Sequence, residues 1–151
     1  MTTGPKQPIT LFLSYAQKDE ACKQEFEDYL AILQHTQLIS SWVERQVQPG
    51  TDWSQVIDPR LSTADFFVPL VSPALFASGY CFGAEVHEAF ERSKAGKARV
   101  IPIILRSVDL TGHPFEKIVS LPRYLAVSSW PDQMAAWKNI DQELRAVIEA
   151  Y

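Results

Sequence analysis

Residues 9–14 read ITLFLS, a short apolar and β-favouring run typical of a strand that is buried on both faces of a parallel sheet. A polar loop at residues 15–18 follows, and Asp19 can cap a helix. Apolar residues then recur three and four positions apart and mark one helix face. They are Cys22, Phe26, Tyr29, Leu30 and Leu33. A buried strand followed by an amphipathic helix is the first unit of an α/β fold.

The rest of the chain repeats this alternation. Further strands are predicted at residues 38–42, 65–72, 99–105 and 124–128, and helices at residues 53–61, 82–94 and 132–151. Pro69 and Pro102 fall inside two of these strands, where proline cannot donate to a ladder, so a bulge or weaker pairing is expected there. The order predicts an α/β, flavodoxin-like fold: a five-stranded parallel sheet of order 2-1-3-4-5 with helices on both faces. Ligands of such sheets bind beyond the carboxyl ends of the strands.

The 151 residues suit one domain at residues 9–151, preceded by a flexible leader at residues 1–8 that contains one glycine and two prolines. The last helix reaches Tyr151 without a closing glycine or proline. We therefore expect the domain to be fused within a longer protein, beside a domain that senses a trigger.

Composition excludes several classes of function. The net charge is −4 and no basic run is present, so nucleic acid is not an expected partner. No apolar stretch approaches the roughly 20 residues of a membrane span, and residues 1–8 lack the apolar core of a signal peptide. The expected location is the cytoplasm, without a membrane.

Cofactor chemistry has little support in the sequence. Cys22 and Cys81 are expected to be reduced, and the three histidines are too scattered for metal-ligand spacing, so no metal is predicted. No glycine-rich dinucleotide or Walker motif follows a strand, so no cofactor is expected.

Glu85 is the acid that the helical pattern singles out. The predicted buried stripe of this helix consists of Phe82, Val86, Ala89 and Phe90. Glu85 lies at the border of that stripe and in the first turn, where the helix dipole favours a negative charge. Glu88 points away from the stripe and can pair with Arg92 four residues later. The pattern alone favours an ordinary first-turn acid on a solvated helix as the reading of Glu85.

Three segments resemble Toll/interleukin-1 receptor (TIR) domains of the bacterial type. They are LFLSYAQKDE at residues 11–20, ISSWVERQVQPGTDW at residues 39–53 and FFVPLVSPALFASGYCFGAEVHEAFER at residues 66–92. RVIPIIL at residues 99–105 and Trp130 also resemble family positions, so the resemblance covers nearly the whole chain. It implies a flavodoxin-like domain that self-associates as a signalling scaffold or cleaves NAD⁺ to nicotinamide and a linear or cyclic ADP-ribose product.

The resemblance also assigns residues. Ser14 and Tyr15 match the first family box, Gly50 lies in the segment called the BB loop, and Ser72 with Pro73 matches the Ser-Pro after the third strand. Glu85 falls where NAD-cleaving members keep their catalytic glutamate. Members often place an aromatic residue four positions before that glutamate. Here that slot holds Cys81 between Tyr80 and Phe82, which leaves open which ring contacts nicotinamide.

A single carboxylate suits this reaction. Cleavage of the bond between nicotinamide and ribose develops an oxocarbenium-like cation, as in glycoside hydrolysis. The leaving group carries a positive charge and departs neutral, so no general acid is needed. Glu85 can therefore supply the electrostatic stabilisation alone.

Each of the other polar or aromatic side chains near the strand ends has two possible roles, one in substrate binding and one in structure. Trp42 and Trp53 flank the polar stretch at residues 44–52 and can stack on a base or close the core. Arg45, read as a loop residue, can hold a phosphate of NAD⁺ or remain a solvated charge. Ser14 and Ser72 can donate to the substrate or cap the strand ends.

Two functions from different classes follow. One is an NAD⁺ nucleosidase activated by self-association, and the other is a non-enzymatic adaptor in which residues 44–52 dock onto another TIR domain. A two-component receiver needs an acidic pair after the first strand and an aspartate after the third. The chain has Ser14 and Ser72 at those places instead.

Overall fold

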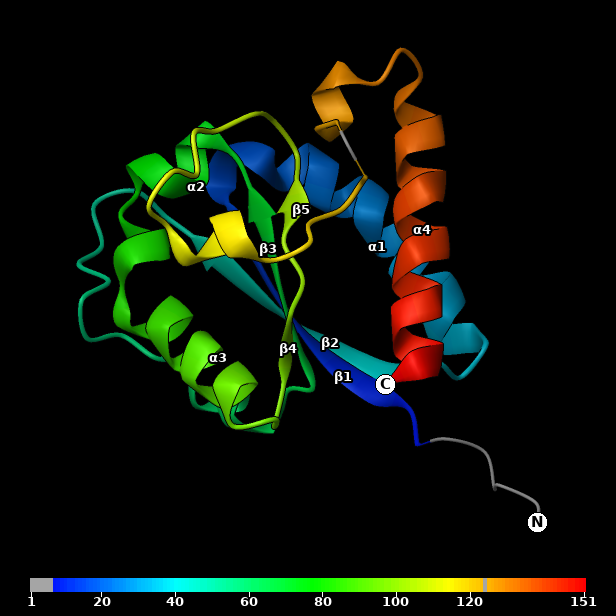
Figure 1. Ribbon diagram of the computed structural model, residues 1–151, viewed down its shortest axis with the longest axis horizontal. Coiled ribbons are helices and arrows are strands. Elements are labelled where there is room, and N and C mark those ends of the chain that lie inside the picture. Colours follow the sequence, from blue (N-terminus) through cyan, green and yellow to red (C-terminus); the bar gives the residue numbers. More distant parts are fainter. Residues whose placement is uncertain (1–6, 124) are drawn as a thin grey trace.

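The computed structural model describes residues 7–123 and 125–151. A central sheet lies between two helical layers (Figure 1). The strands are β1 (Ile9–Ala16), β2 (Ile39–Val47), β3 (Phe66–Val71), β4 (Arg99–Val100) and β5 (Ile103–Ile104). The α-helices are α1 (Glu20–His35), α2 (Pro73–Ala77), α3 (Ala84–Lys94) and α4 (Gln133–Ala150). Helices α1 and α4 cover one face of the sheet, and α2 and α3 lie on the other side.

All pairings in the five-stranded sheet are parallel, in the order β2-β1-β3-β4 with β5 also beside β3. This confirms the predicted α/β, flavodoxin-like class. Ser14 is in register with Arg45 of β2 on one side and with Pro69 of β3 on the other. The carboxyl ends of these three strands therefore meet at one edge.

The two strand prolines explain a break in the sheet. β4 pairs with Phe66 and Phe67 and β5 with Leu70 and Val71, so the ladder on that side is interrupted opposite Pro69. Pro102 lies between β4 and β5. Because neither proline has an N–H to donate, the predicted strand at residues 99–105 is two short strands, as the expectation of weaker pairing implied.

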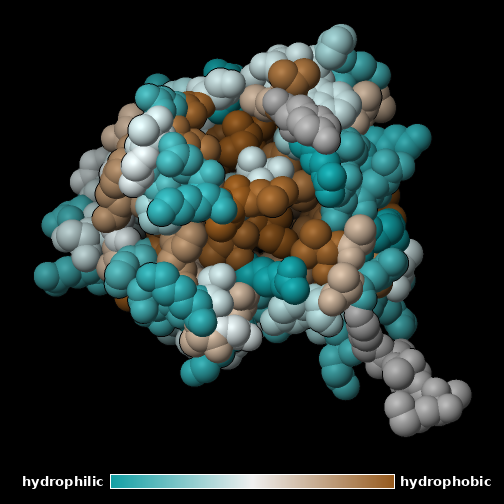
Figure 2. All heavy atoms as spheres, in the orientation of Figure 1, coloured by the Kyte–Doolittle hydropathy of each residue, from teal (hydrophilic) through white to brown (hydrophobic). Residues whose placement is uncertain are grey.

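The predicted last strand at residues 124–128 is not formed. Tyr124 lies outside the described residues, and Val127–Ser129 is a 3-10 turn. Leu121 makes a single bridge to Ile103 instead, so the fifth strand of the sheet is β5. Beyond the β4 edge, Figure 2 shows a hollow with hydrophobic residues at its base. A cavity of about 540 Å³ there is lined in part by Val100, Leu121 and Val147.

Two buried clusters form the core, one on each face of the sheet. The predicted faces of α1 and α4 pack together on one side, where the Phe26 and Trp137 rings stack at 5.7 Å. On the other side Phe12 stacks on Phe67 at 5.9 Å. Asp132 caps α4 as predicted, because its carboxylate accepts the Met134 N–H at 2.9 Å.

Two segments differ from the predicted elements. β2 continues to Val47, five residues beyond its predicted end. The predicted helix at residues 53–61 is absent, and residues 48–58 form an irregular connection that ends in a 3-10 turn at Pro59–Thr63. Among the described residues, no helix has both the length and the apolar character needed to span a bilayer.

Candidate functional site

Glu85 lies on the first turn of α3 and is almost completely buried, with 1% of its surface exposed. Its carboxylate accepts hydrogen bonds from three parts of the chain. Arg45 donates from Nη2 to Oε1 at 2.8 Å and from Nε at 3.1 and 3.2 Å. The Asp58 N–H donates to Oε1 at 2.8 Å, and the Tyr80 hydroxyl donates to Oε2. Glu85 is therefore more deeply buried than its predicted position at the border of the stripe implies.

Arg45 reaches Glu85 from β2, and the prediction that it lies in a loop is wrong. Strand side chains alternate between faces. Val43 and Val47 pack into the core on the α3 side, so Arg45 between them points to the same side. The guanidinium also lies over the Trp53 ring at 5.1 Å. Its hydrogen bonds to Glu85 raise the pKa of Arg45, so it is a permanent cation.

Two aromatic side chains form the wall of the site. Tyr80 is fully buried, and Trp53 packs edge-on against it at 5.1 Å. Burial, with the nearby Glu85 charge, raises the pKa of Tyr80 well above its usual value. The phenol is therefore a neutral donor. The backbone of Gly83 packs closely against Trp53 and holds it in place. A Cβ at position 83 would lie 2.4 Å from the Trp53 carbonyl oxygen.

One polar atom in the wall of the site, Trp53 Nε1, is buried without a hydrogen-bond partner among the described residues. A second buried group, the Ser14 hydroxyl, lies beside the Tyr80 hydroxyl and acts as a hydrogen-bond donor towards it. Ser14 is fully buried and in register with Arg45, and Trp53 contacts both Arg45 and Tyr80. Buried polar groups usually have partners. A free donor near a buried carboxylate is suited to a ligand that carries hydroxyl groups.

Tyr15 and Trp42, predicted to bind substrate, lie on the opposite face of the sheet from Glu85. Lys23 is buried there, with its ammonium 5.1 Å from the Tyr15 ring centroid. Burial alone would lower the pKa of Lys23, but its hydrogen bonds to Glu27 and Glu20 raise it. Trp42 Nε1 donates to Glu27 at 3.0 Å. This cluster joins α1 to β2 and is structural.

Ser72 and Asp19 form a second contact at the strand ends. The buried Ser72 hydroxyl donates to Asp19 and accepts the Leu75 N–H at 3.2 Å. The predicted cap of α1 is therefore corrected, since the Asp19 side chain caps no N–H of that helix. Ser72 caps α2 and joins the end of β3 to the 3-10 turn at Gln17–Asp19, which follows β1.

The environments of Cys81, Phe82 and Arg92 complete the comparison with the predictions. Cys81 is buried, and burial raises the pKa of its thiol to about 12, so it is a neutral group. Phe82 is 71% exposed and does not belong to the buried stripe, because α3 begins only after Gly83. Arg92 donates to the carbonyls of Ala64 and Lys97 in place of the predicted pairing with Glu88.

Gly50 has φ of 89°, a left-handed conformation that glycine adopts without strain. It lines a cavity of about 510 Å³ at the carboxyl ends of β1 and β2, together with Ala16, Val47 and Ala77. Ala16 and Val47 stand two residues beyond Ser14 and Arg45 on the same strands. The cavity therefore adjoins the Glu85 site about 7 Å further along the sheet.

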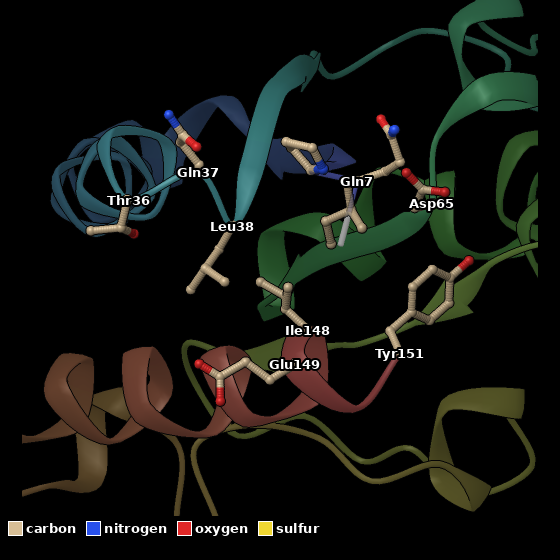
Figure 3. Close-up of a pocket in the computed structure, with 10 residues that line it drawn as sticks. Gln7, Thr36, Gln37, Leu38, Asp65, Ile148, Glu149 and Tyr151 are labelled. Carbon is tan, nitrogen blue, oxygen red and sulfur yellow. The ribbon is translucent and has the colours of Figure 1, made fainter. Parts of the chain in front are cut away.

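A larger cavity of about 750 Å³ lies at the opposite end of the strands (Figure 3). Leu38, Asp65, Ile148 and Tyr151 are among its lining residues. Asp65 is already bound to the Thr10 N–H at 2.9 Å. The amino ends of parallel strands are not where such sheets bind ligands. No group of three potential metal ligands occurs in the parts of the chain that the structure describes.

Sequence patterns missed one component of the site, the Asp58 N–H. A backbone donor carries no residue signature, and the irregular course of residues 48–58 has no period to follow. The position of Arg45 did have a signal, because Val43 and Val47 alternate around it.

Comparisons with known proteins agree with this architecture. A family model described as TIR domain matches residues 11–140. An uncharacterized protein of Sinorhizobium fredii (strain NBRC 101917 / NGR234), y4lF, is 35% identical over 137 residues, which are 90% of this chain and 42% of that protein. The chain thus spans about two fifths of the length of this relative. The family match covers most of the fold described above, and the chain belongs to the TIR domain family.

Proposed function

We propose that this TIR domain is an NAD⁺ nucleosidase, a signalling or defence enzyme that cleaves the nicotinamide to ribose bond and is activated by self-association. With water the products are nicotinamide, ADP-ribose and a proton; attack by the adenine ring gives nicotinamide, cyclic ADP-ribose and a proton. The observation that carries the proposal is the buried carboxylate of Glu85, which is paired with Arg45 near the carboxyl end of β2.

Glu85 would stabilise the cation that forms at the ribose carbon when nicotinamide leaves. An ionised group in a site that excludes water acts more strongly than the same group in solution. Trp53 Nε1, which has no partner among the described residues, would donate to a ribose hydroxyl or phosphate. The Ser14 hydroxyl beside Tyr80 would turn to the substrate when it binds. Tyr80 is a neutral donor to Glu85 and would keep the carboxylate oriented.

The cavity of about 510 Å³ next to the site would take an aromatic ring of the substrate. Its walls are mainly small and apolar, from Ala16, Val47, Pro49, Ala74 and Ala77. Its volume falls in the range usual for small-molecule sites. A dinucleotide with one ribose at Glu85 would place a ring in this cavity.

The test is incubation with NAD⁺ over a range of protein concentrations, with nicotinamide and the ADP-ribose products separated by liquid chromatography. We expect a rate per protomer that rises with concentration in the wild type, and no cleavage by Glu85→Gln. Glu88→Gln is the matched control, because Glu88 lies one turn further along α3 and is half-buried. Wild-type cleavage by folded Glu85→Gln would refute the assignment.

The second candidate is a non-enzymatic adaptor that acts through TIR to TIR contacts. Both Glu85 oxygens are already bonded within the chain, and this favours a structural role for the carboxylate. This candidate predicts no nicotinamide at any protein concentration. Sedimentation velocity would then show the self-association without turnover.

A further inference from the structure

We propose that Arg45 is an inhibitory latch: its guanidinium occupies the place of the substrate cation beside Glu85, and the segment at residues 54–58 closes over the pair. The inference rests on the proposed nucleosidase function. It concerns the control of that site, which the proposed reaction leaves open.

The first argument is charge. Stabilisation of an oxocarbenium ion needs a carboxylate whose negative charge is free to face it. Here the Arg45 guanidinium binds both oxygens of Glu85, at distances between 2.8 and 3.2 Å. The pair is neutral overall, so it offers a second cation little net attraction. The conformation described here therefore cannot perform the proposed chemistry.

The second argument is position. Arg45 lies between a carboxylate and an aromatic face, because its guanidinium is 5.1 Å from the Trp53 ring. Such a place suits any delocalised cation. The ribosyl group of NAD⁺, which becomes cationic as nicotinamide leaves, could take it only after Arg45 moves. The side chain of Arg45 is 20% exposed, whereas that of Glu85 is 1% exposed. Arg45 therefore has a path to the solvent.

The third argument is the segment that covers the site. Residues 54–57 are exposed and lie outside any helix or strand. They are held on one side by Trp53, whose carbonyl accepts the Ala84 N–H at 3.0 Å. On the other side the Asp58 N–H is bonded to Glu85 Oε1, the oxygen that Arg45 Nη2 also binds. Movement of Arg45 therefore changes the acceptor that holds the segment closed.

The latch predicts that opening has two linked results. The charge of Glu85 is no longer neutralised by Arg45, and the hydrogen bond from the Asp58 N–H is weakened. The released guanidinium becomes available to a phosphate of the substrate. Self-association would activate the domain if the contact between copies favours the open segment.

The test uses Arg45→Gln, which removes the cation and keeps a polar side chain, and Arg123→Gln as the matched control. Arg123 also pairs with a glutamate, Glu143 at 3.2 Å, but is 54% exposed. Hydrogen exchange at residues 54–58 is measured by mass spectrometry, alongside nicotinamide release at saturating NAD⁺ and low protein concentration. We expect exchange of the Asp58 amide to be about tenfold faster in Arg45→Gln, since a hydrogen bond network to a charged group is loosened. The maximal rate should rise above that of wild type, and Arg123→Gln should change neither quantity.

The outcomes separate the latch from the proposed function. Faster exchange with no NAD⁺ cleavage by any variant would support the latch as a structural device and refute the nucleosidase. Unchanged exchange would refute the latch, whatever the activity. Faster exchange with a maximal rate below that of an active wild type would also refute inhibition, and would make Arg45 a positioning residue for the reaction.

Discussion

Replacement of Glu85 by alanine should destabilise the domain about twice as much as replacement by glutamine. Alanine removes the acceptor for the Arg45 guanidinium, the Asp58 N–H and the Tyr80 hydroxyl at once. Breaking a buried ion pair by removing one partner costs roughly 3–5 kcal/mol. Because Arg45 is 20% exposed and can regain water, we expect the lower end, about 3 kcal/mol.

Glutamine keeps the shape and one carbonyl oxygen. That oxygen can replace Oε1 and keep its bonds from Asp58 and Arg45, which lie at 2.8 Å. The amide nitrogen then faces Tyr80, whose hydroxyl can rotate to accept. The losses are the negative charge and the Oε2 acceptor of Arg45 Nε, which together are worth about 1–2 kcal/mol.

Urea unfolding followed by circular dichroism measures both losses, and thermal unfolding gives a second reading. For a chain of this length 1 kcal/mol corresponds to roughly 2–4 °C, so alanine should lower Tm by about 6–12 °C. Glu88→Ala is the control and should change Tm little, because Glu88 is half-buried and does not hold Arg45. A Glu85→Ala protein as stable as wild type, or less damaged than Glu85→Gln, would refute the network described here.

Gly83→Ala should cost about 1–3 kcal/mol by overpacking, since the added Cβ would meet the Trp53 carbonyl oxygen at 2.4 Å; wild-type stability in urea unfolding would contradict this contact. The raised pKa of Tyr80 means that its contribution to stability is complete below the unfolded pKa of about 10 and is lost as pH rises towards the folded pKa. Tyr80→Phe should therefore reduce the loss of stability in alkaline solution, and an unchanged alkaline profile would show that the phenol is not buried. Lys23→Met leaves the carboxylates around Lys23 without their shared cation. It should lower stability by about 2 kcal/mol at pH 7 and by less at pH 4, and an equal loss at both pH values would show that packing, not charge, is the cause.

Much of the fold could be predicted because burial leaves a period in the sequence. β1 and β3 are continuous apolar runs, and α1 and α4 repeat apolar residues every three or four positions. The predicted end of β2 falls too early because β2 is an edge strand, in which polar side chains interrupt the apolar pattern. The predicted strand at residues 124–128 is wrong for a different reason. Val127 packs on the core from a 3-10 turn while Leu125 is exposed, and a short apolar run in the sequence does not distinguish this arrangement from a strand.

The candidate site was only half predictable for a related reason. Helical periodicity places Glu85 relative to its own helix, at the border of the buried stripe. It cannot show that residues 53–58 fold over that border and that β2 supplies Arg45 from 40 residues away. The depth of Glu85 is a tertiary property, and the ion pair follows from it, because a carboxylate buried to this extent needs a compensating cation.

The energy of the proposed latch decides whether the proposed self-association can open it. If the latch favours the closed form by about 3 kcal/mol, the open form is populated at roughly 1%. A contact between copies that buries on the order of 120 Å² of apolar surface only in the open form supplies that energy at about 25 cal/mol per Å². This is a small part of a stable interface, which buries more than about 1,000 Å². The wild-type rate per protomer should then rise by up to about 100-fold with protein concentration and level off. Since Arg45→Gln starts from the open form, its maximal rate should depend little on concentration, and a steep dependence in that variant would place the activating step somewhere other than the latch.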